Sequence, residues 1–295
     1  MEGQTFTLPD GRRLGYTELG DPDGFPLFIF HGTPGSRLAH GPDEPVARIP
    51  GLRIIMTDRP GYGLSDPQPK RTLLDWPDDV AALADHLDFR RFAVAGGSGG
   101  GPHAAACAYK LPDRVSVAIL FSSPAPANFA GAAKGLSMGN LVSVVVSKYA
   151  PWLRRMLMNR YRKIFLKNPE GYIDAIAAQM SACDRQIMQQ PEIRERIKAD
   201  LWEAYRQGVE GHIRDSQLVM TSRGWGFDLS QITVPVHVWY GEQDRLVTKA
   251  MAQYLVRTIP TARPHFLPEK GHLLLSDPEI VPEMMKPVLQ SRLGD

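Results

Sequence analysis

The chain has 295 residues, 43% of them hydrophobic and 22% charged, which is ordinary for a soluble globular protein and suits one large α/β domain with an insertion. Its formal net charge of +2 provides no strong electrostatic attraction to nucleic acid or to a membrane surface. We therefore expect a small-molecule substrate and no nucleic-acid partner.

The beginning of the chain lacks the apolar segment of a signal peptide, and no apolar run reaches the length of a membrane span. The two cysteines, Cys107 and Cys183, are far apart and lack metal-ligand spacing. We expect both to be free cysteines that pack as small hydrophobic residues, in a reducing compartment. These features predict a cytoplasmic protein without a membrane span.

Short strand patterns separated by turns dominate the first part of the chain. Residues 4–8 and 12–19 flank the turn signal Pro9-Asp10-Gly11, which predicts a β-hairpin. Later runs are apolar throughout, which is typical of parallel strands covered by helices on both faces. These runs are 27–31, 52–58, 91–97, 115–123 and 234–244, and a last strand is predicted at 263–268.

Amphipathic helical segments alternate with these strands. In 73–88 we expect Asp75 to cap the N-terminus and Pro77 to lie in the first turn. Pro282 and Pro287 are expected to kink or break the last helix. The other helical segments are 100–111, 247–259 and 278–293. Such alternation predicts an α/β fold with a doubly wound, mostly parallel sheet.

Between Pro124 and about Ile232 the alternation stops and helical patterns continue without a convincing strand. The helical segments are 135–149, 151–166, 172–188 and 192–208. An all-helical insertion between two strands predicts a cap on the C-terminal edge of the sheet, where α/β folds bind ligands. The predicted domains are a core at 1–123 and 233–295 and a cap at 124–232.

Ser98 lies among five glycines, in the sequence Gly96-Gly97-Ser98-Gly99-Gly100-Gly101, between a buried strand and a helix. This arrangement satisfies the G-x-S-x-G pattern in the strand–turn–helix context that it requires. The sharp turn would raise the serine hydroxyl above the sheet, and the glycines would let strand and helix pass closely. We therefore predict Ser98 as a nucleophile, against the alternative of a flexible Gly/Ser loop.

A serine hydroxyl needs a base to accept its proton, and eight histidines are available. His272 follows the last predicted strand and is the preferred candidate. His103 is five positions along the helix from Ser98 and would point away from the hydroxyl, while His237 lies inside a strand. His40 and His212 have no supporting context.

Asp244 ends a buried strand and is the preferred residue to orient the histidine and stabilise its cation. Glu242 is a weaker candidate, and Asp277 is too close behind His272. The loop at 30–36 would supply the backbone N–H of Thr33, which with that of Gly99 would bind a developing oxyanion. His31 in this loop is expected to be structural.

Taken together, the sequences HGTPGS, DRPGYGLSD, GGSGGG, WYGEQD and KGH resemble the α/β-hydrolase superfamily in order and spacing, in its serine esterase and proline-iminopeptidase-like branch. The resemblance implies an eight-stranded, mostly parallel sheet, a Ser-acid-His order and hydrolysis through an acyl-enzyme without cofactor or metal. It also implies structural roles for Asp58, Arg59 and Asp66 in the second motif.

Three functional hypotheses remain open. The first is hydrolysis of a small or medium carboxylic ester or a lactone. The second is cleavage of an amide or a C–C bond, although proline aminopeptidases have Trp where this chain has Gly99. Their cap carboxylates have no marked counterpart among Glu170, Glu192, Glu203 and Glu210. The third is a non-catalytic binding protein, against which an intact Ser/Asp/His set argues. Dehalogenase chemistry needs a carboxylate where Ser98 stands.

The cap helices contain more apolar residues than one packing face needs. We expect some of those in 135–146 and around Met156, Leu157 and Met158 to lie above Ser98 and form an apolar acyl or alcohol pocket. The basic residues in 152–167 alternate with apolar ones at helical spacing and indicate an amphipathic helix with a solvated face.

Overall fold

The computed structural model describes residues 3–129, 132, 150–219 and 224–292. The helix predicted at 135–149 lies outside the described residues. Eight strands form one sheet in the order β1-β2-β4-β3-β5-β6-β7-β8. The strands are β1 (Gln4–Thr7), β2 (Arg13–Gly20), β3 (Phe25–Phe30), β4 (Leu52–Thr57), β5 (Phe92–Gly97), β6 (Val115–Phe121), β7 (Val236–Gly241) and β8 (Ala262–Leu267).

Only the first two strand pairs are antiparallel. The predicted hairpin pairs β1 with β2, β2 pairs antiparallel with β4, and every later pair is parallel. The prediction of an α/β fold with a mostly parallel sheet is confirmed. The carboxyl ends of the parallel strands therefore meet along one edge, where their following loops lie close together.

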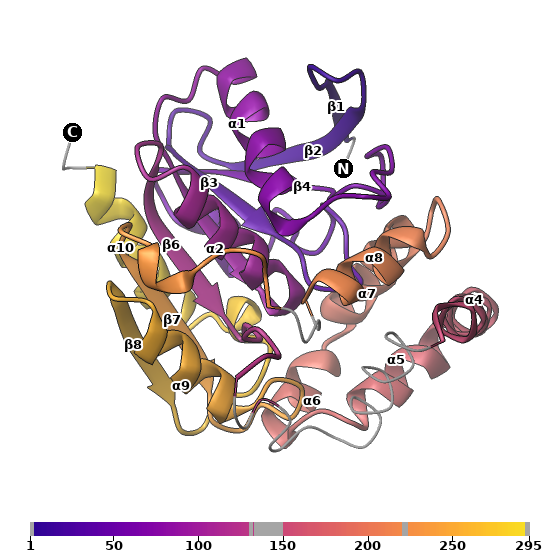
Figure 1. Ribbon diagram of the computed structural model, residues 1–295. Coiled ribbons are helices and arrows are strands. Elements are labelled where there is room, and N and C mark those ends of the chain that lie inside the picture. The colour runs from indigo at the N-terminus through magenta and orange to yellow at the C-terminus, as the bar shows by residue number, and fades with distance from the viewer. Residues whose placement is uncertain (1–2, 130–131, 133–149, 220–223, 293–295) are drawn as a thin grey trace.

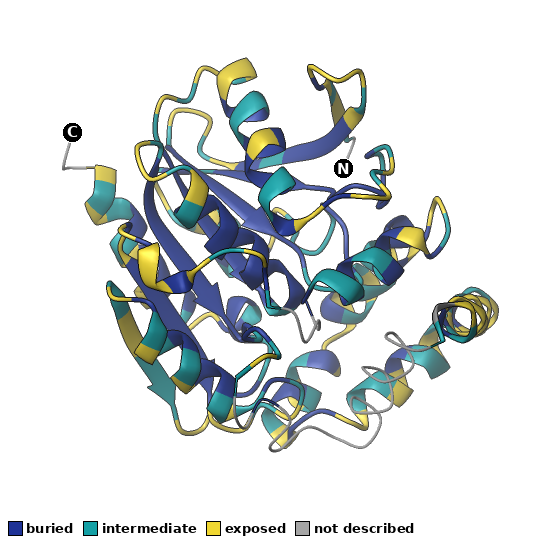
Figure 2. Ribbon diagram, in the orientation of Figure 1, coloured by how far each residue is buried: buried dark blue, intermediate teal, exposed yellow. Residues whose placement is uncertain are grey.

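Helices cover both faces of the sheet (Figure 1). The helices α1 (Trp76–His86), α2 (Gly101–Lys110) and α9 (Lys249–Thr258) pack with one hydrophobic cluster, and α10 (Val281–Ser291) packs with the other. Strands β3, β5, β6 and β7 are buried throughout, as Figure 2 shows. Burial on both faces explains why these strands are apolar without alternation.

Two predictions about helices need correction, one at the start of α1 and one within α10. Asp75 occupies the N-cap position of α1, but its carboxylate accepts hydrogen bonds from the backbone N–H and hydroxyl of Thr72, at 2.6 and 2.7 Å, and so closes the preceding 3-10 turn. Pro282 lies in the first turn of α10, and the helix continues unbroken through Pro287. The buried face of α10 against the sheet holds the helix together across the missing N–H.

Between β6 and β7 the described residues form five helices, which we call the cap helices. They are α4 (Pro151–Lys167), α5 (Pro169–Ala177), α6 (Ala182–Met188), α7 (Pro191–Ala204) and α8 (Glu210–Val219). They lie together at the lower right of Figure 1. The segment predicted as one helix at 172–188 is divided into α5 and α6, and the hydroxyl of Ser181 caps α6 by accepting from the N–H of Asp184.

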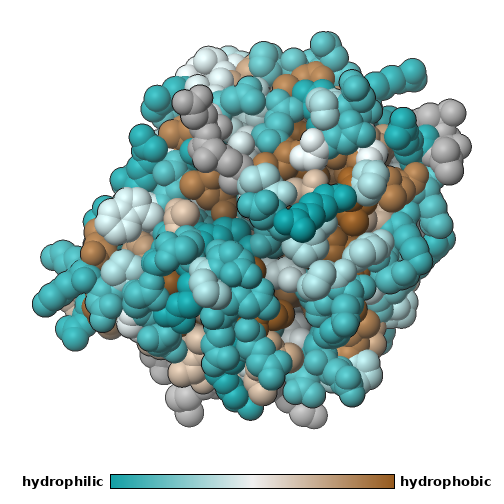
Figure 3. Space-filling model, turned by 180° about the vertical axis from the view of Figure 1, so that it is seen from behind, coloured by the Kyte–Doolittle hydropathy of each residue, from teal (hydrophilic) through white to brown (hydrophobic). Residues whose placement is uncertain are grey.

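The face seen from behind in Figure 3 is mostly hydrophilic, with apolar side chains in small separate patches. Among the described residues, the large apolar side chains that are exposed all lie on α4 and α7, including Trp152 and Trp202. No helix within the described ranges is both long and apolar enough to cross a bilayer.

Candidate active site

Ser98 sits at a sharp turn between β5 and α2. Its φ of +50° lies in the left-handed region, which a residue with a side chain adopts only when the surrounding structure imposes it. A Cβ on Gly96 would collide with the backbone of Gly100, and a Cβ on Gly100 would collide with the carbonyl oxygen of Phe30. The glycines are therefore required by close backbone approach, as the sequence pattern predicts.

His272 and Asp244 lie side by side at the same edge of the sheet. The Nδ1 atom of His272 is 2.7 Å from Oδ2 of Asp244, whose side chain is fully buried. The other carboxylate oxygen accepts the backbone N–H groups of Leu246 and Val247, at 2.7 and 3.0 Å. Burial by itself lowers the pKa of His272, but the charges of Asp244 and Asp184 outweigh it and raise the pKa above its ordinary value.

Ser98 and His272 line the same cavity, which has a volume of about 180 Å³. Core side chains such as Phe121 and cap side chains such as Ile193 and Ile197 form its apolar walls. Polar groups also face it, namely His31, His40, Arg196, Asp200 and Ser276. The structure thus brings the predicted nucleophile, base and orienting carboxylate to one place.

Met156, Leu157 and Met158 do not line this cavity, contrary to expectation. Met156 is exposed, and Met158 packs with Phe165 inside the cap helices. Among the described residues, the apolar side chains that reach the cavity from the cap helices come from α7 instead. The remaining part of this expectation, at 135–146, falls outside the described residues.

The loop that contains Thr33 runs close to Gly99. A Cβ on Gly99 would collide with the Thr33 side chain and lie 3.2 Å from the Thr33 backbone nitrogen. Gly32 and Pro34, on either side of Thr33, line the Ser98 cavity, whereas Thr33 and Gly99 are not among its lining residues. The two predicted oxyanion donors are therefore neighbours.

Arg59 braces this loop from within the core. Its guanidinium donates to the carbonyl oxygens of His31 and Gly32, the latter at 2.8 Å, and to the hydroxyl of Thr33 at 3.1 Å. The His31 ring lies 2.7 Å from the Gly32 carbonyl oxygen and accepts the Arg59 backbone N–H at 3.2 Å. Both residues act on loop geometry, as expected of them.

Asp215, on cap helix α8, completes this brace and was not predicted from the sequence. It is fully buried, forms an ion pair with Arg59 at 2.7 Å and another with Arg71, and accepts the Thr33 hydroxyl at 3.3 Å. Burial by itself raises the pKa of Asp215, but the two arginine charges outweigh it and hold the pKa well below its ordinary value.

The other histidines have structural contacts. The Nδ1 atom of His103 lies 3.0 Å from the Gly99 carbonyl oxygen, and burial lowers its pKa to about 3, so the ring is neutral. His237 stacks on His265 within the sheet, and His212 contacts the hydroxyl of Tyr205. His40, which has no supporting context in the sequence, also lines the Ser98 cavity, as His31 and His272 do.

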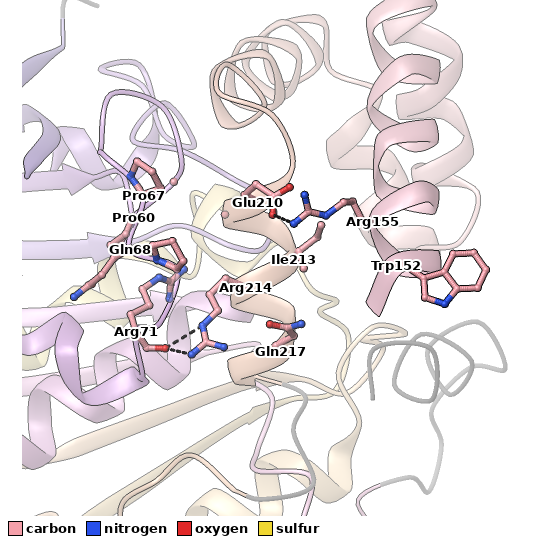
Figure 4. A pocket seen from close by; sticks show the side chains of 13 residues that line it. Pro60, Pro67, Gln68, Arg71, Trp152, Arg155, Glu210, Ile213, Arg214 and Gln217 are labelled. Atoms are coloured by element: carbon pink, nitrogen blue, oxygen red, sulfur yellow. Dashed lines mark hydrogen bonds and ion pairs between the residues drawn. The ribbon is translucent and has the colours of Figure 1, made fainter. Parts of the chain in front are cut away.

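None of the four cap glutamates considered for an amino-group site lines the Ser98 cavity. Glu203 pairs with Arg37 at 2.6 Å, Glu170 pairs with Lys198 at 2.6 Å, and Glu192 is exposed. Glu210 pairs with Arg155 across a separate cleft of about 700 Å³ between α4 and α8 (Figure 4). The cap carboxylate that does line the Ser98 cavity is Asp200.

No sequence pattern marks Asp200 and Arg196 as cavity residues. They lie one helical turn apart on α7, among charged residues of the kind found on any solvated helix face. Within the parts of the chain that the structure describes, no three His, Cys, Asp or Glu side chains are grouped to hold a metal ion.

Residues 26–278 match the model of the alpha/beta hydrolase fold family. A non-heme chloroperoxidase of Streptomyces lividans is 36% identical over 41% of this chain and 45% of its own length. A proline iminopeptidase of Xylella fastidiosa is 34% identical over 41% of this chain and 39% of its own. The matched part therefore spans less than half the length of either relative.

A longer match is to a 2-hydroxy-6-oxononadienedioate/2-hydroxy-6-oxononatrienedioate hydrolase of Cupriavidus pinatubonensis, 26% identical over 75% of this chain and 70% of its own. Among solved structures, the esterase RhEst1 from Rhodococcus sp. has a TM-score of 0.69 at 19% identity, covering 98% of this chain and 99% of that one. An enol-lactonase from Burkholderia xenovorans has a TM-score of 0.67 at 18% identity, with 98% and 100% covered. These structural likenesses support the fold.

Proposed function

Because the chain belongs to the α/β-hydrolase fold family, we propose that it is a serine hydrolase that cleaves a small or medium carboxylic ester or lactone through an acyl-enzyme. One observation carries the proposal. Ser98 has a positive φ at the end of β5 and shares a cavity with His272, whose Nδ1 faces the buried Asp244. This is the arrangement that an activated serine requires.

In the proposed reaction, the Ser98 Oγ atom attacks the ester carbonyl carbon while its proton passes to Nε2 of His272. The new imidazolium is stabilised by Asp244 through Nδ1–H. The backbone N–H groups of Thr33 and Gly99 would stabilise the oxyanion, and such a donor contributes about 3 kcal/mol in the transition state. When the C–O bond breaks, the leaving alkoxide takes the proton from His272. A water molecule then attacks the acyl-enzyme and gives a proton to His272. The acid is released as the Ser98 oxygen takes that proton back.

The cavity supports an apolar substrate group of modest size. Phe121, Ile193 and Ile197 contribute apolar wall to the cavity, and the volume of about 180 Å³ favours a short chain. We propose that this cavity holds the acyl or the alcohol part of the ester. The residues in 135–146, which lie outside the described ranges, were predicted to contribute to the same pocket.

An aminopeptidase or amidase is the second candidate, and Asp200 is the observation that favours it. A carboxylate beside the nucleophile could bind a substrate amino group. However, Oδ1 of Asp200 already accepts both the backbone N–H and the hydroxyl of Ser36, each at 2.7 Å. Burial raises the pKa of Asp200 to about 7, and Arg196 on the same cavity disfavours a cationic ligand. An ester substrate therefore fits better.

The test is a labelling experiment joined to a substrate screen. A fluorophosphonate probe should label the wild-type protein at Ser98, and Ser98→Ala should abolish both labelling and turnover. Ser230→Ala, which alters a surface serine bonded only to Asp228, should keep both. The screen should compare esters of increasing acyl length, lactones, aminoacyl amides and carbon–carbon bond substrates.

Labelling at another serine, or turnover in Ser98→Ala, would overturn the assignment of the nucleophile. If aminoacyl amides were hydrolysed faster than every neutral ester, the aminopeptidase hypothesis would replace the ester hypothesis. A preference for vinylogous diketone substrates would select carbon–carbon bond cleavage in the same way. Absence of labelling and turnover with every substrate would favour the non-catalytic binding protein.

A further inference from the structure

The backbone of His272 is held by a carboxylate that comes from the cap. Oδ2 of Asp184, on α6, accepts the N–H of His272 at 3.0 Å, and Oδ1 accepts the N–H of Leu273 at 3.0 Å. The two partners are separated from Asp184 by 88 and 89 residues in the sequence. A pair of backbone hydrogen bonds to one carboxylate fixes both the position and the orientation of the loop.

Asp184 is itself fixed and buried. Its side chain is almost fully enclosed, and the hydroxyl of Ser181 donates to Oδ2 at 2.6 Å. A Cβ on Gly271 would collide with this carboxylate, so glycine is required for the loop to approach it. Both parts of the molecule therefore contribute to this contact. The Ser181 hydroxyl of the cap holds the carboxylate, and the absence of a side chain at Gly271 of the core leaves room for it.

Three different elements hold His272. Asp184 binds its N–H from the cap, the hydroxyl of Ser122 at the end of β6 donates to its carbonyl oxygen at 2.8 Å, and Asp244 faces its ring from the loop after β7. Since the two core contacts leave the backbone N–H of His272 unanchored, Asp184 supplies the remaining constraint. Loss of the Asp184 contact would let the His272 ring change its position while the contacts with Ser122 and Asp244 remain.

The charged and titratable groups around His272 come from both parts of the molecule. Asp244 and Asp184 carry the negative charges that favour its protonated form. The groups that face it across the cavity are His31, His40, Arg196 and Asp200.

We propose that Asp184 is a positioning residue for the base, holding His272 in place from the cap so that the base is complete only while α6 is seated on the core. This inference rests on the proposed function of His272. Asp184 does not line the Ser98 cavity, and its carboxylate acts through the loop backbone.

The test is the variant Asp184→Asn, which keeps the shape of the side chain and removes its charge. We expect kcat to fall about 10- to 100-fold, because a displaced catalytic group costs rate even when it is chemically intact. We also expect the pKa of His272 to fall, because a nearby negative charge that raises it is lost. The acid limb of the kcat/KM profile should then move to lower pH while its plateau drops.

The pKa should be measured directly, by NMR titration of the His272 imidazole, assigned by the signal that disappears in His272→Ala. Asp277→Asn is the matched control, because Asp277 is a buried carboxylate that follows His272 closely and pairs with Lys270 instead. It should leave the titration of His272 unchanged. A second variant, Ser181→Ala, keeps the charge and removes the hydroxyl that holds it, and should lower kcat less than Asp184→Asn does.

A folded Asp184→Asn protein with an unchanged His272 titration and unchanged kcat would overturn the proposal. So would an equal shift in Asp277→Asn. If Asp184→Asn fails to fold, an unchanged kcat in Ser181→Ala overturns it. The NMR titration does not depend on turnover, so failure of the proposed hydrolase activity and failure of the role of Asp184 give different results.

Discussion

The sheet core and the cap helices contribute to the candidate site in different ways. In the core, Ser98 is placed by local backbone geometry, because the glycines around it let β5 and α2 pass closely. In the cap, placement depends on three aspartates from three helices, each bonded to a loop of the core. Asp184 holds His272, Asp200 holds Ser36, and Asp215 holds Arg59 and Thr33.

This difference separates the residues that would carry out the proposed reaction from the residues that would adjust it. The core supplies the proposed nucleophile, its base and the orienting carboxylate, while the cap fixes the loops that carry two of the proposed groups and lines part of the cavity. Changes in the core should therefore remove the chemistry, and changes in the cap should lower stability, shift positions or alter substrate choice.

The largest effect should come from the core pair His272 and Asp244. We expect Asp244→Asn and His272→Ala each to reduce kcat/KM by about 10⁴-fold or more, with the double variant little worse than either. Because His272 must be neutral to accept a proton and its pKa is raised above the ordinary 6.5, kcat/KM of the wild type should rise with pH to a midpoint above 6.5.

The matched control for this pair is Glu242→Gln, a neighbouring carboxylate that pairs with Lys249 on the surface. Steady-state rates across the pH range decide the outcome. A rate that stays flat between about pH 6 and 8 would contradict a histidine base. Equal damage from Glu242→Gln and Asp244→Asn would mean that the orienting carboxylate has been wrongly assigned.

A cap change of intermediate size is Asp215→Asn. It would leave the buried guanidinium groups of Arg59 and Arg71 without their counter-charge, and breaking a buried pair in this way costs about 3–5 kcal/mol in the free energy of unfolding. Asp66→Asn, which breaks the exposed pair with Arg13, should cost far less. Urea or thermal unfolding measures both, and equal losses would contradict the special role of the cap aspartate.

The same variant predicts a pH dependence. Since folding lowers the pKa of Asp215 below its ordinary value of 3.8, its contribution to stability is present above that value and is lost as the pH falls through the lower, folded value. In Asp215→Asn the acid side of the stability profile should therefore be flatter than in the wild type.

The smallest effect should be a change in substrate preference. Each methylene that fits the cavity contributes up to about 0.8 kcal/mol, so kcat/KM for straight-chain esters should climb with acyl length and then fall. Ile197→Ala enlarges the cavity from the cap side and should move the optimum to longer chains. Ile164→Ala, on the exposed part of α4, should leave it unchanged. An optimum that ignores Ile197 would place the acyl group elsewhere.

Much of the core could be predicted from sequence because its signals are local. The sharp turn at Ser98 depends on residues within a few positions, and Asp244 follows the apolar run of β7. The strands carry their burial in an uninterrupted apolar pattern. His272 was found by its place after the last strand, which also needs only local reasoning.

The contribution of the cap could not be predicted for a physical reason. Asp184, Asp200 and Asp215 are bonded to residues 88, 164 and 156 positions away, so no neighbouring residue marks them. On an amphipathic helix, an acidic residue that becomes buried against the core has the same sequence pattern as one that faces water. The prediction for Met156 was wrong in the opposite way. This apolar residue lies beside the buried face of its helix, yet its side chain is exposed.

The contacts of Asp200 and Asp215 have a consequence for the order in which the chain folds. The loop at 31–36 follows β3 early in the chain, while the two carboxylates that hold it follow from far downstream. Contacts so distant in sequence form late, because a long loop must close before they stabilise anything. During synthesis, most of the sheet would exist before the loop at 31–36 is fixed. Catalytic competence should therefore be among the last properties that the folding chain acquires, and a nascent chain would stay inactive while its core matures.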